Sequence, residues 1–410
     1  MIQFLEESKK TSAVIANLST KVKNSVLNQM ADALEKHCDY IISHNDIDIK
    51  AGKKNNLSDA LMDRLLLTGE RVQSMATAIR EIATLKEPVG KIIEGWVTEN
   101  GLNIQKVSVP IGVIGIIYES RPNVTSDTAA LCFKSGNVCV LKGGKEAEHS
   151  NKAIAAVLQD VLTKNKLPQH AIALLPDSSR EGVDILIKQD KFVDLIIPRG
   201  GEALISHVSK NSSVPVVKHD KGLCHTYVDK NADGQMAINI AINAKCQRPG
   251  VCNSMETLLV HKDIAALILP PLHEAFIQEN TELRGCDFTR KLIDIQCATH
   301  EDYDTEYLAN ILSIKIVKDV KEAVFHINKF GSGHSEAIIS ENYTAVNYFL
   351  DNVDAAAVYA NASTRFTDGE AFGFGAEVGI STSKLHARGP MGINDLTTYK
   401  FKIHGNGQTR

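Results

Sequence analysis

The sequence predicts an α/β protein built around a doubly wound parallel sheet, followed by a second α/β region. Short apolar runs and helical segments alternate from Pro110 to about residue 218, and a second succession runs from Cys224 to about residue 360. Such alternation places a parallel sheet between two layers of helices. The chain has 410 residues, of which 43% are hydrophobic and 23% charged. This composition is typical of a globular protein, and the length favours two or three domains.

Residues 1–90 are expected to form consecutive amphipathic helices. Apolar residues recur there at helical spacing, and Lys- and Glu-rich stretches between them indicate solvated faces. The apolar positions that carry this pattern are Val22, Leu27, Met30, Leu34, Leu61, Leu65 and Leu66.

A β-hairpin is expected next, over Trp96–Val107. Its residues alternate in polarity around Asn100-Gly101, and an Asn-Gly pair is the strongest short-range signal for a hairpin turn. A long hairpin outside the alternating core has edges that need cover, and a neighbouring subunit is one candidate for that cover.

The first α/β region is then divided by apolar runs and helical spacing. The expected strands are 112–117, 137–141, 171–175, 192–197 and 214–218, and the expected helices are 123–133, 147–162, 180–188 and 201–209. Each strand except the last is followed by a helix, as a parallel sheet requires.

Charge and cysteine content exclude several classes of protein. The formal net charge of −4 gives no reason to expect nucleic acid or an anionic membrane as a partner. The eight cysteines contain no C-x-x-C pair, which argues against a zinc cluster and a disulfide framework. No apolar run reaches membrane-spanning length, and the first ten residues carry charges where a signal peptide is apolar. A cytoplasmic protein is expected.

The segment around Cys252 is the strongest candidate for chemistry. Pro249-Gly250 is expected to end a helix over 236–245, and 257–260 is expected to be a buried strand. A thiol between these two elements has a fixed backbone and partial access, which a nucleophilic cysteine requires. The alternative is a small buried hydrophobic residue, the usual environment of a free cysteine.

Three glycine-containing turns follow expected strands and predict a nucleotide-binding crevice. They are Lys142-Gly-Gly144-Lys145, Pro198-Arg-Gly200-Gly201 and His219-Asp-Lys-Gly222. Glycine lets backbone N–H groups approach phosphate, and ligands of parallel sheets bind at the carboxyl ends of strands. The G-x-G-x-x-G motif is absent, and each turn taken alone is better explained as an ordinary loop; the prediction rests on the three turns together. Lys142 and Lys145 suit a phosphorylated ribose.

Two further polar segments contain candidate site residues. Ser120 and Arg121 end an apolar strand, and Asn123 is placed to cap the following helix. Residues 361–379, which include Arg365, form either a substrate-lining loop or a surface loop. His219 and His225 have no further ligand at a spacing typical of zinc sites, so no metal is expected.

Four segments together resemble a known family: Gln247–Asn253, Tyr118–Thr125, Ile196–Gly201 and Lys384–Met391. They resemble the gamma-glutamyl phosphate reductase family, the proline-biosynthesis branch of the aldehyde dehydrogenase superfamily. The resemblance covers essentially the whole chain and implies the aldehyde dehydrogenase-like fold. The implied domains are a Rossmann-like NADP-binding domain over 1–223, with hairpin 94–109 as an oligomerisation extension, and a catalytic domain over 224–360. Residues 361–396 would return to the cofactor domain, and 397–410 would add a C-terminal oligomerisation strand.

The resemblance also implies an activity and partners. The expected reaction is NADPH-dependent reduction of L-glutamyl 5-phosphate to L-glutamate 5-semialdehyde, through a thioester on Cys252. A homo-oligomer, either a dimer or a tetramer, and an association with glutamate 5-kinase are expected partners. Two alternatives stay open: another acyl-phosphate or acyl-CoA reductase of the superfamily, and a catalytically silent scaffold for the kinase.

Site residues follow from the same resemblance. The oxyanion would be held by the Cys252 N–H with Asn123 or Ser120, and Arg121, Arg248 and Arg365 are candidates for the substrate carboxylate. The residues expected to bind substrate also include Asn253, and those expected to bind the cofactor are Lys142, Gly144, Lys145, Gly200, Gly201, Gly222 and Glu306. Aldehyde-oxidising relatives have a glutamate that activates water for hydrolysis of the thioester. The corresponding turn here, His219-Asp-Lys-Gly222, lacks that glutamate. The absence of the glutamate favours reduction of the thioester over hydrolysis.

Overall fold

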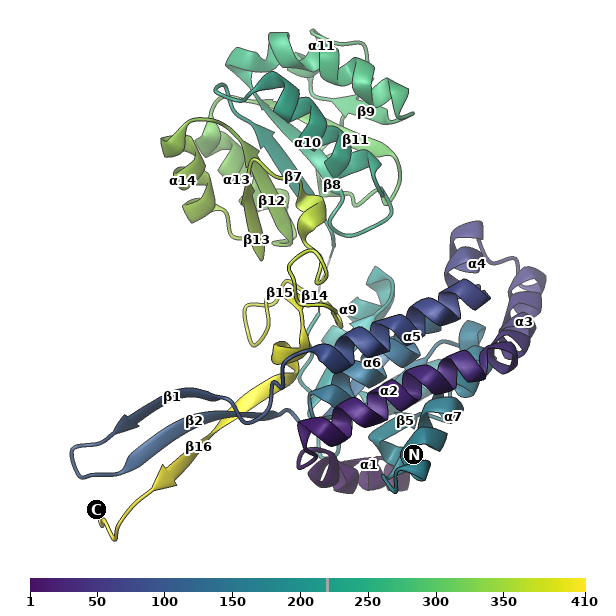
Figure 1. Cartoon of the computed structure of the whole chain (residues 1–410). Helices are drawn as coiled ribbons and strands as arrows, with labels where there is room; N and C mark the ends of the chain where they lie inside the picture. The colour runs from purple at the N-terminus through teal and green to yellow at the C-terminus, as the bar shows by residue number, and fades with distance from the viewer. Residues whose placement is uncertain (219–220) are drawn as a thin grey trace. The chain divides into compact units, whose positions relative to one another are not determined.

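The computed structural model describes residues 1–218 and 221–410, which form two compact units (Figure 1). Unit 1 comprises Met1–Lys218, Gly373–Gly379 and Met391–Arg410, and unit 2 comprises His219–Phe372 and Ile380–Pro390. His219 and Asp220 of the third glycine-containing turn lie outside the described residues.

Unit 1 begins with five helices, as the apolar spacing predicts. They are α1 (Ile2–Ile15), α2 (Thr20–Lys36), α3 (Cys38–Lys54), α4 (Asp59–Leu65) and α5 (Gly69–Thr84). Side-chain oxygens of Ser19, Ser58 and Thr68 cap α2, α4 and α5. Most of the predicted apolar face is buried, whereas Val22 is 40% exposed and Leu66 is 37% exposed.

The sheet of unit 1 is parallel and has the order β5-β4-β3-β6. Its strands are β3 (Val113–Tyr118), β4 (Val138–Gly143), β5 (Ile172–Leu174) and β6 (Leu195–Arg199), and its helices are α6 (Asn123–Lys134), α7 (Glu148–Lys164), α8 (Arg180–Leu186) and α9 (Glu202–Asn211). The strand order changes direction between β3 and β6, where a doubly wound sheet opens a crevice. The strand predicted over 214–218 is wrong, because this segment makes only one bridge, between Val216 and Ile196.

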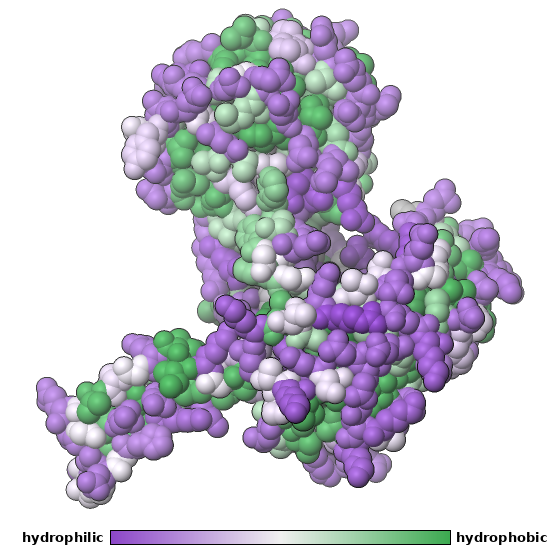
Figure 2. Space-filling model, in the orientation of Figure 1, coloured by the Kyte–Doolittle hydropathy of each residue, from purple (hydrophilic) through white to green (hydrophobic). Residues whose placement is uncertain are grey.

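A three-stranded antiparallel sheet also belongs to unit 1. It has the order β1-β2-β16, with β1 (Ile92–Val97), β2 (Asn103–Pro110) and β16 (Thr397–His404). The predicted turn joins β1 to β2, and Gly101 has a φ of 82°, a conformation that glycine adopts without strain. All six residues of β1 are exposed. Figure 2 shows hydrophobic residues among hydrophilic ones on the visible face of this sheet.

Unit 2 contains a seven-stranded parallel sheet of order β10-β9-β11-β8-β7-β12-β13. Its strands are β7 (Cys224–Val228), β8 (Met255–His261), β9 (Glu282–Gly285), β10 (Gln296–Cys297), β11 (Ile311–Val317), β12 (Ser335–Ile339) and β13 (Ala357–Ala360). Its helices are α10 (Gly234–Cys246), α11 (Lys262–Gln278), α12 (Asp287–Arg290), α13 (Val320–Phe330) and α14 (Tyr343–Asn352). One apolar cluster joins α10 and α11 to the sheet, and another joins α13 and α14 to it.

The C-terminal part of the chain differs from the expected domain division. Residues 361–396 were expected to return as a whole to the cofactor domain, yet 361–372 and 380–390 belong to unit 2. The physical reason is local bonding: Asn253 donates to the carbonyl of Thr367, and Asp354 accepts from Arg388. The segment also contains a two-stranded sheet of β14 (Gly379–Ser381) and β15 (Gly389–Met391).

No helix in the described part of the chain is long and apolar enough to cross a membrane.

Candidate active site

Cys252 lies in an irregular segment that connects α10 to β8 in unit 2. The helix ends at Cys246 and the strand begins at Met255, so the predicted interruption at Pro249-Gly250 is confirmed. The Cys252 side chain is partly exposed. Its position therefore combines a backbone held by two regular elements with access for a substrate.

The segment before β7 fixes the backbone of Cys252. The thiol of Cys224 donates to the Cys252 carbonyl at 3.2 Å. The backbone of Gly222 approaches so closely that an added Cβ would overlap the Cα and the carbonyl oxygen of Cys252. Gly222, which we expected to bind the cofactor, is thus explained by packing against the cysteine. The structure shows no separate reason for a glycine there.

Asn253 and Arg365 form a compact polar cluster next to Cys252. The Asn253 amide donates to the carbonyl of Thr367 at 2.8 Å and accepts from a guanidinium nitrogen of Arg365. Thr364 donates to the Asn253 carbonyl at 2.7 Å. The loop containing Arg365 is thereby bound to the cysteine segment, as expected of a substrate-lining loop.

Two arginines supply positive charge beside the thiol. Arg365 also donates from Nε to Gln247 at 2.9 Å, whereas Arg248 is exposed. Burial, and then the charge of Arg248, lower the pKa of Arg365. Charge repulsion between two neighbouring guanidinium groups is relieved when a bound anion lies between them.

A buried ion pair spans the cysteine segment, and sequence reasoning did not predict it. Lys245, in the last turn of α10, contacts Glu256 of β8 at 2.6 Å. Burial lowers the pKa of Lys245 and raises the pKa of Glu256 to about 7. Glu306 lies near Glu256, since its charge also raises the pKa of that carboxyl. The signal available in the sequence was a charged residue at the end of a helix and another at the start of a strand, both expected to face the core.

The carboxyl ends of β3, β4 and β6 gather the predicted cofactor residues in unit 1. Lys142 is buried and donates to the carbonyl of Ser178 at 2.8 Å, and burial lowers its pKa. Lys145 is exposed, immediately beyond Gly144. Lys145 forms no ion pair among residues 1–218 and 221–410, so its charge is available to a ligand.

Two glutamates also lie just beyond these strand ends, and sequence reasoning missed both. The Gly201 N–H at the start of α9 donates to Glu119 at 2.9 Å, and Gly200 lies against the same carboxylate. Glu146 accepts from both the backbone N–H and the hydroxyl of Ser120. In the structure these N–H and O–H groups are bonded to the chain's own carboxylates, so the predicted phosphate-binding role of the glycine turns stays a prediction.

The two oxyanion candidates have different surroundings. Ser120 has a φ of 40°, an uncommon conformation for a residue with a side chain, and its hydroxyl is bonded to Glu146. Asn123 is exposed, and its amide donates to Asp127 at 2.9 Å. The expected capping by Asn123 is wrong: Asn123 is the first residue of α6, Pro122 is the N-cap, and no side chain caps the helix.

The structure thus brings the predicted residues together in two groups. Unit 2 contains Cys252, Arg248, Asn253, Arg365, Gly222 and Glu306, and unit 1 contains Ser120, Arg121, Asn123, Lys142, Gly144, Lys145, Gly200 and Gly201. Arg121 is exposed at the end of β3. In the part of the chain that the structure describes, no three His, Cys, Asp or Glu residues are arranged to hold a metal ion.

A partly exposed cysteine in one α/β unit and lysines at the strand ends of another fit a cofactor-dependent oxidoreductase of the aldehyde dehydrogenase kind, and comparisons with known proteins agree. The aldehyde dehydrogenase family model matches residues 2–283 and 297–401. The gamma-glutamyl phosphate reductases of Aliarcobacter butzleri and Sulfurovum sp. are 67% and 65% identical over the full length of both chains. The crystal structure of the same enzyme from Thermotoga maritima is 45% identical and superimposes with a TM-score of 0.98, covering 100% of this chain and 99% of that one. The chain therefore belongs to the gamma-glutamyl phosphate reductases within the aldehyde dehydrogenase family.

Proposed function

We propose that the chain catalyses the NADPH-dependent reduction of L-glutamyl 5-phosphate to L-glutamate 5-semialdehyde, with release of phosphate, in proline biosynthesis. The observation that carries this proposal is full-length identity of 67% to a gamma-glutamyl phosphate reductase, combined with a partly exposed Cys252 whose backbone is fixed by Gly222 and Cys224.

In the first half of the reaction, the Cys252 thiolate attacks the acyl carbonyl carbon. An S–C bond forms, the C–O bond to phosphate breaks, and phosphate leaves with the electron pair of that bond. The thioester that results is electrophilic enough to accept a hydride. Arg248 and Arg365 stabilise the negative charges of the substrate, because guanidinium groups bind carboxylate and phosphate in a bidentate manner.

Bound NADPH supplies the hydride that reduces the thioester. The residues present fit this cofactor: Lys145 is an exposed cation without an ion pair among the described residues. Lys145 would attract the 2′-phosphate, and Gly144, Gly200 and Gly201 have no side chain that would keep the backbone from the pyrophosphate. Once the hydride has added to the carbonyl carbon, the S–C bond breaks, its electron pair returns to sulfur, the aldehyde forms, and the Cys252 thiolate is regenerated.

Asn123 is the better of the two oxyanion candidates. Its amide carries two hydrogens, of which Asp127 accepts one, whereas the single hydroxyl hydrogen of Ser120 is donated to Glu146. Asn123 therefore retains a donor, which we assign to the developing oxyanion. Ser120 then acts as a positioning residue just beyond the end of β3.

The exposed three-stranded sheet supports a homo-oligomer, a dimer or a tetramer. Apolar side chains of β1 and β16 are exposed, among them Val97 at 66% and Ile403 at 58%. Exposed apolar residues on a sheet with two open edges favour burial by a second copy. Size-exclusion chromatography with light scattering measures this state. Association with glutamate 5-kinase and a cytoplasmic location complete the proposal.

The deciding experiment compares Cys252→Ala with Cys246→Ala in the reverse reaction, followed by NADP reduction with pyrroline-5-carboxylate and phosphate. Loss of at least about a thousandfold in kcat is expected for Cys252→Ala, and near-normal activity for Cys246→Ala. Undiminished activity of Cys252→Ala would contradict the mechanism. Phosphate release from glutamyl phosphate, without turnover of acyl-CoA, distinguishes this enzyme from another reductase of the family.

A further inference from the structure

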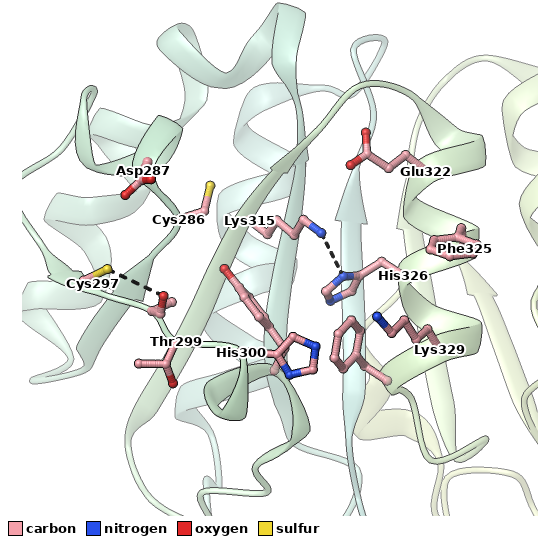
Figure 3. Close-up of a pocket in the computed structure, with 13 residues that line it drawn as sticks. Cys286, Asp287, Cys297, Thr299, His300, Lys315, Glu322, Phe325, His326 and Lys329 are labelled. Carbon is pink, nitrogen blue, oxygen red and sulfur yellow. Dashed lines mark hydrogen bonds between the residues drawn. The ribbon is translucent and has the colours of Figure 1, made fainter.

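Unit 2 contains a cavity of about 480 Å³ that includes none of the residues of the Cys252 site. It lies where β9 and β10 end: Gly285 of β9 pairs with Ile314 in the middle of β11, so no strand fills the space beyond. Cys286 and Ala298, which directly follow the two short strands, line it together with Thr299 (Figure 3). Ligands of parallel sheets bind beyond the carboxyl ends of strands, whereas Gly222 and Cys252 precede β7 and β8.

Two lysines give the cavity positive charge. Lys315 of β11 and Lys329 of α13 line it, and neither forms an ion pair within the described residues. Its two carboxylates have other partners: Glu322 accepts from the backbone N–H of Lys318 at 2.8 Å, and Asp287 contacts Arg290 at 3.9 Å. Neither ammonium group therefore forms a direct ion pair with a described carboxylate, although Glu322 and Asp287 keep their negative charges.

A buried histidine lies between the two lysines. Lys315 is 3.3 Å from Nδ1 of His326, and Figure 3 shows the ends of Lys315 and Lys329 on two sides of this ring. Burial and the surrounding charges of His225, Lys315 and Lys329 lower the pKa of His326 to about 2. His326 is therefore neutral, so it accepts a hydrogen bond from Lys315 and holds that ammonium group in place.

Aromatic rings form the wall next to these charges. The ring of His326 lies 5.2 Å from that of Tyr303 and 4.6 Å from that of Phe330, and His300 lies 5.1 Å from Phe330. Lys329 is 4.9 Å from the centre of the Phe330 ring. Tyr303 and His326 are buried. A flat ligand would therefore stack on the half-buried Phe330 and the exposed His300, while its charged group reaches the lysines.

We propose that this cavity binds a small anion that carries a flat ring, with a phosphate or a carboxylate as its charged group. Neither the lysines nor the rings take part in the proposed reaction at Cys252. The site is thus an addition to that function and does not depend on it.

Isothermal titration calorimetry on the full chain tests this binding with four probes. Phenyl phosphate and benzoate distinguish the two charged groups, and phenol and inorganic phosphate separate the ring from the charge. Phenyl phosphate or benzoate is expected to bind at one site per chain. Phenol and inorganic phosphate are expected to bind at least about tenfold more weakly, because phenol lacks the charged group and phosphate lacks the ring.

Variants assign the binding to the cavity. Lys315→Met and Lys329→Met are each expected to weaken binding roughly fivefold to tenfold, and Phe330→Leu roughly fivefold. Lys321→Met, an exposed position on the same helix that does not line the cavity, is the matched control and leaves the affinity unchanged. Thermal unfolding verifies that each variant folds. Because Lys329 is exposed, the Lys329→Met variant tests the proposal even if Lys315→Met is unstable.

Three outcomes overturn the proposal. They are failure of both phenyl phosphate and benzoate to bind, equal affinity in the Lys329→Met and Lys321→Met variants, and loss of binding in Arg248→Gln. The last result would place the ligand beside Cys252.

Discussion

Lys245 and Glu256 form a fully buried ion pair on either side of the segment that carries Cys252. Their charged atoms are 2.6 Å apart, with side-chain exposures of 0% and 1%. Because Lys245 lies in the last turn of α10 and Glu256 is the second residue of β8, the pair connects the two elements that set the position of the cysteine. A buried pair of this kind fixes geometry more than it adds stability.

Glu256→Gln is expected to lower the free energy of unfolding by about 3–5 kcal/mol, because it leaves the Lys245 ammonium buried without a counter-charge. The double variant Lys245→Met/Glu256→Leu removes both charges and is expected to regain most of that loss. Urea unfolding followed by circular dichroism measures both. A double variant less stable than Glu256→Gln would show that the pair is a net source of stability.

Gly222→Ala is expected to displace Cys252 and lower kcat roughly 100-fold, because the added methyl group overlaps the cysteine backbone. Gly234→Ala, at the first residue of α10, is the matched control, since a Cβ there meets only Ile268 at 3.6 Å. Steady-state kinetics and the rate of iodoacetamide labelling at Cys252 report the change. Normal labelling and normal kcat in Gly222→Ala would refute the close approach.

Lys145→Ala is expected to raise KM for NADPH about tenfold and to leave KM for NADH unchanged, because only NADPH carries the 2′-phosphate. The control is Lys152→Ala, which removes a lysine paired with Glu148 at 2.5 Å. Initial rates of the reverse reaction with NADP and NAD give the same comparison. Equal changes in KM for NADPH and NADH would show that Lys145 does not act on the 2′-phosphate.

Acid is expected to weaken the packing of α2 against α5 through Glu35. Hydrogen bonds from Arg80 and Gln73 lower the pKa of Glu35 from 4.5 to about 2. Its stabilising contribution is therefore complete above pH 4.5 and is lost as the pH falls through 2. The contribution is about 1 kcal/mol, because solvent screens a pair whose carboxylate is 31% exposed.

The measurement is the free energy of unfolding between pH 2 and 6, for the wild type and Glu35→Gln. The difference between the two proteins should narrow as the pH falls. A constant difference over this range would show that the hydrogen bonds do not depend on the charge of Glu35.

Much of the fold was accessible from the sequence because its signals are local. The helices of residues 1–90, the Asn100-Gly101 hairpin and the end of α10 before Pro249 each depend on spacing or turn chemistry within a few residues. The resemblance carried by the motifs around Cys252 and Arg121 supplied the family, which full-length identity confirms.

The features that could not be predicted from the sequence depend on contacts between residues far apart in the chain. The carboxylates of Glu119 and Glu146 bind N–H groups that only the folded sheet brings near, and Glu256 meets Lys245 across an irregular segment. Asn123 looked like a helix cap, but the helix begins one residue earlier than that role requires. The role of Gly222 became visible only when its neighbour in space was known to be Cys252.

The pairing of β16 with β2 has a consequence for the order in which the protein is made. Thr397 pairs with Pro110 and His404 with Asn103, so the two strands are roughly 290 residues apart in the chain. At roughly 5–20 residues per second, a ribosome needs roughly 15 to 60 s between them. During that interval the nascent hairpin presents an unpaired strand edge beside exposed apolar side chains. A trigger-factor-type chaperone that covers this edge during translation would raise the yield of native protein.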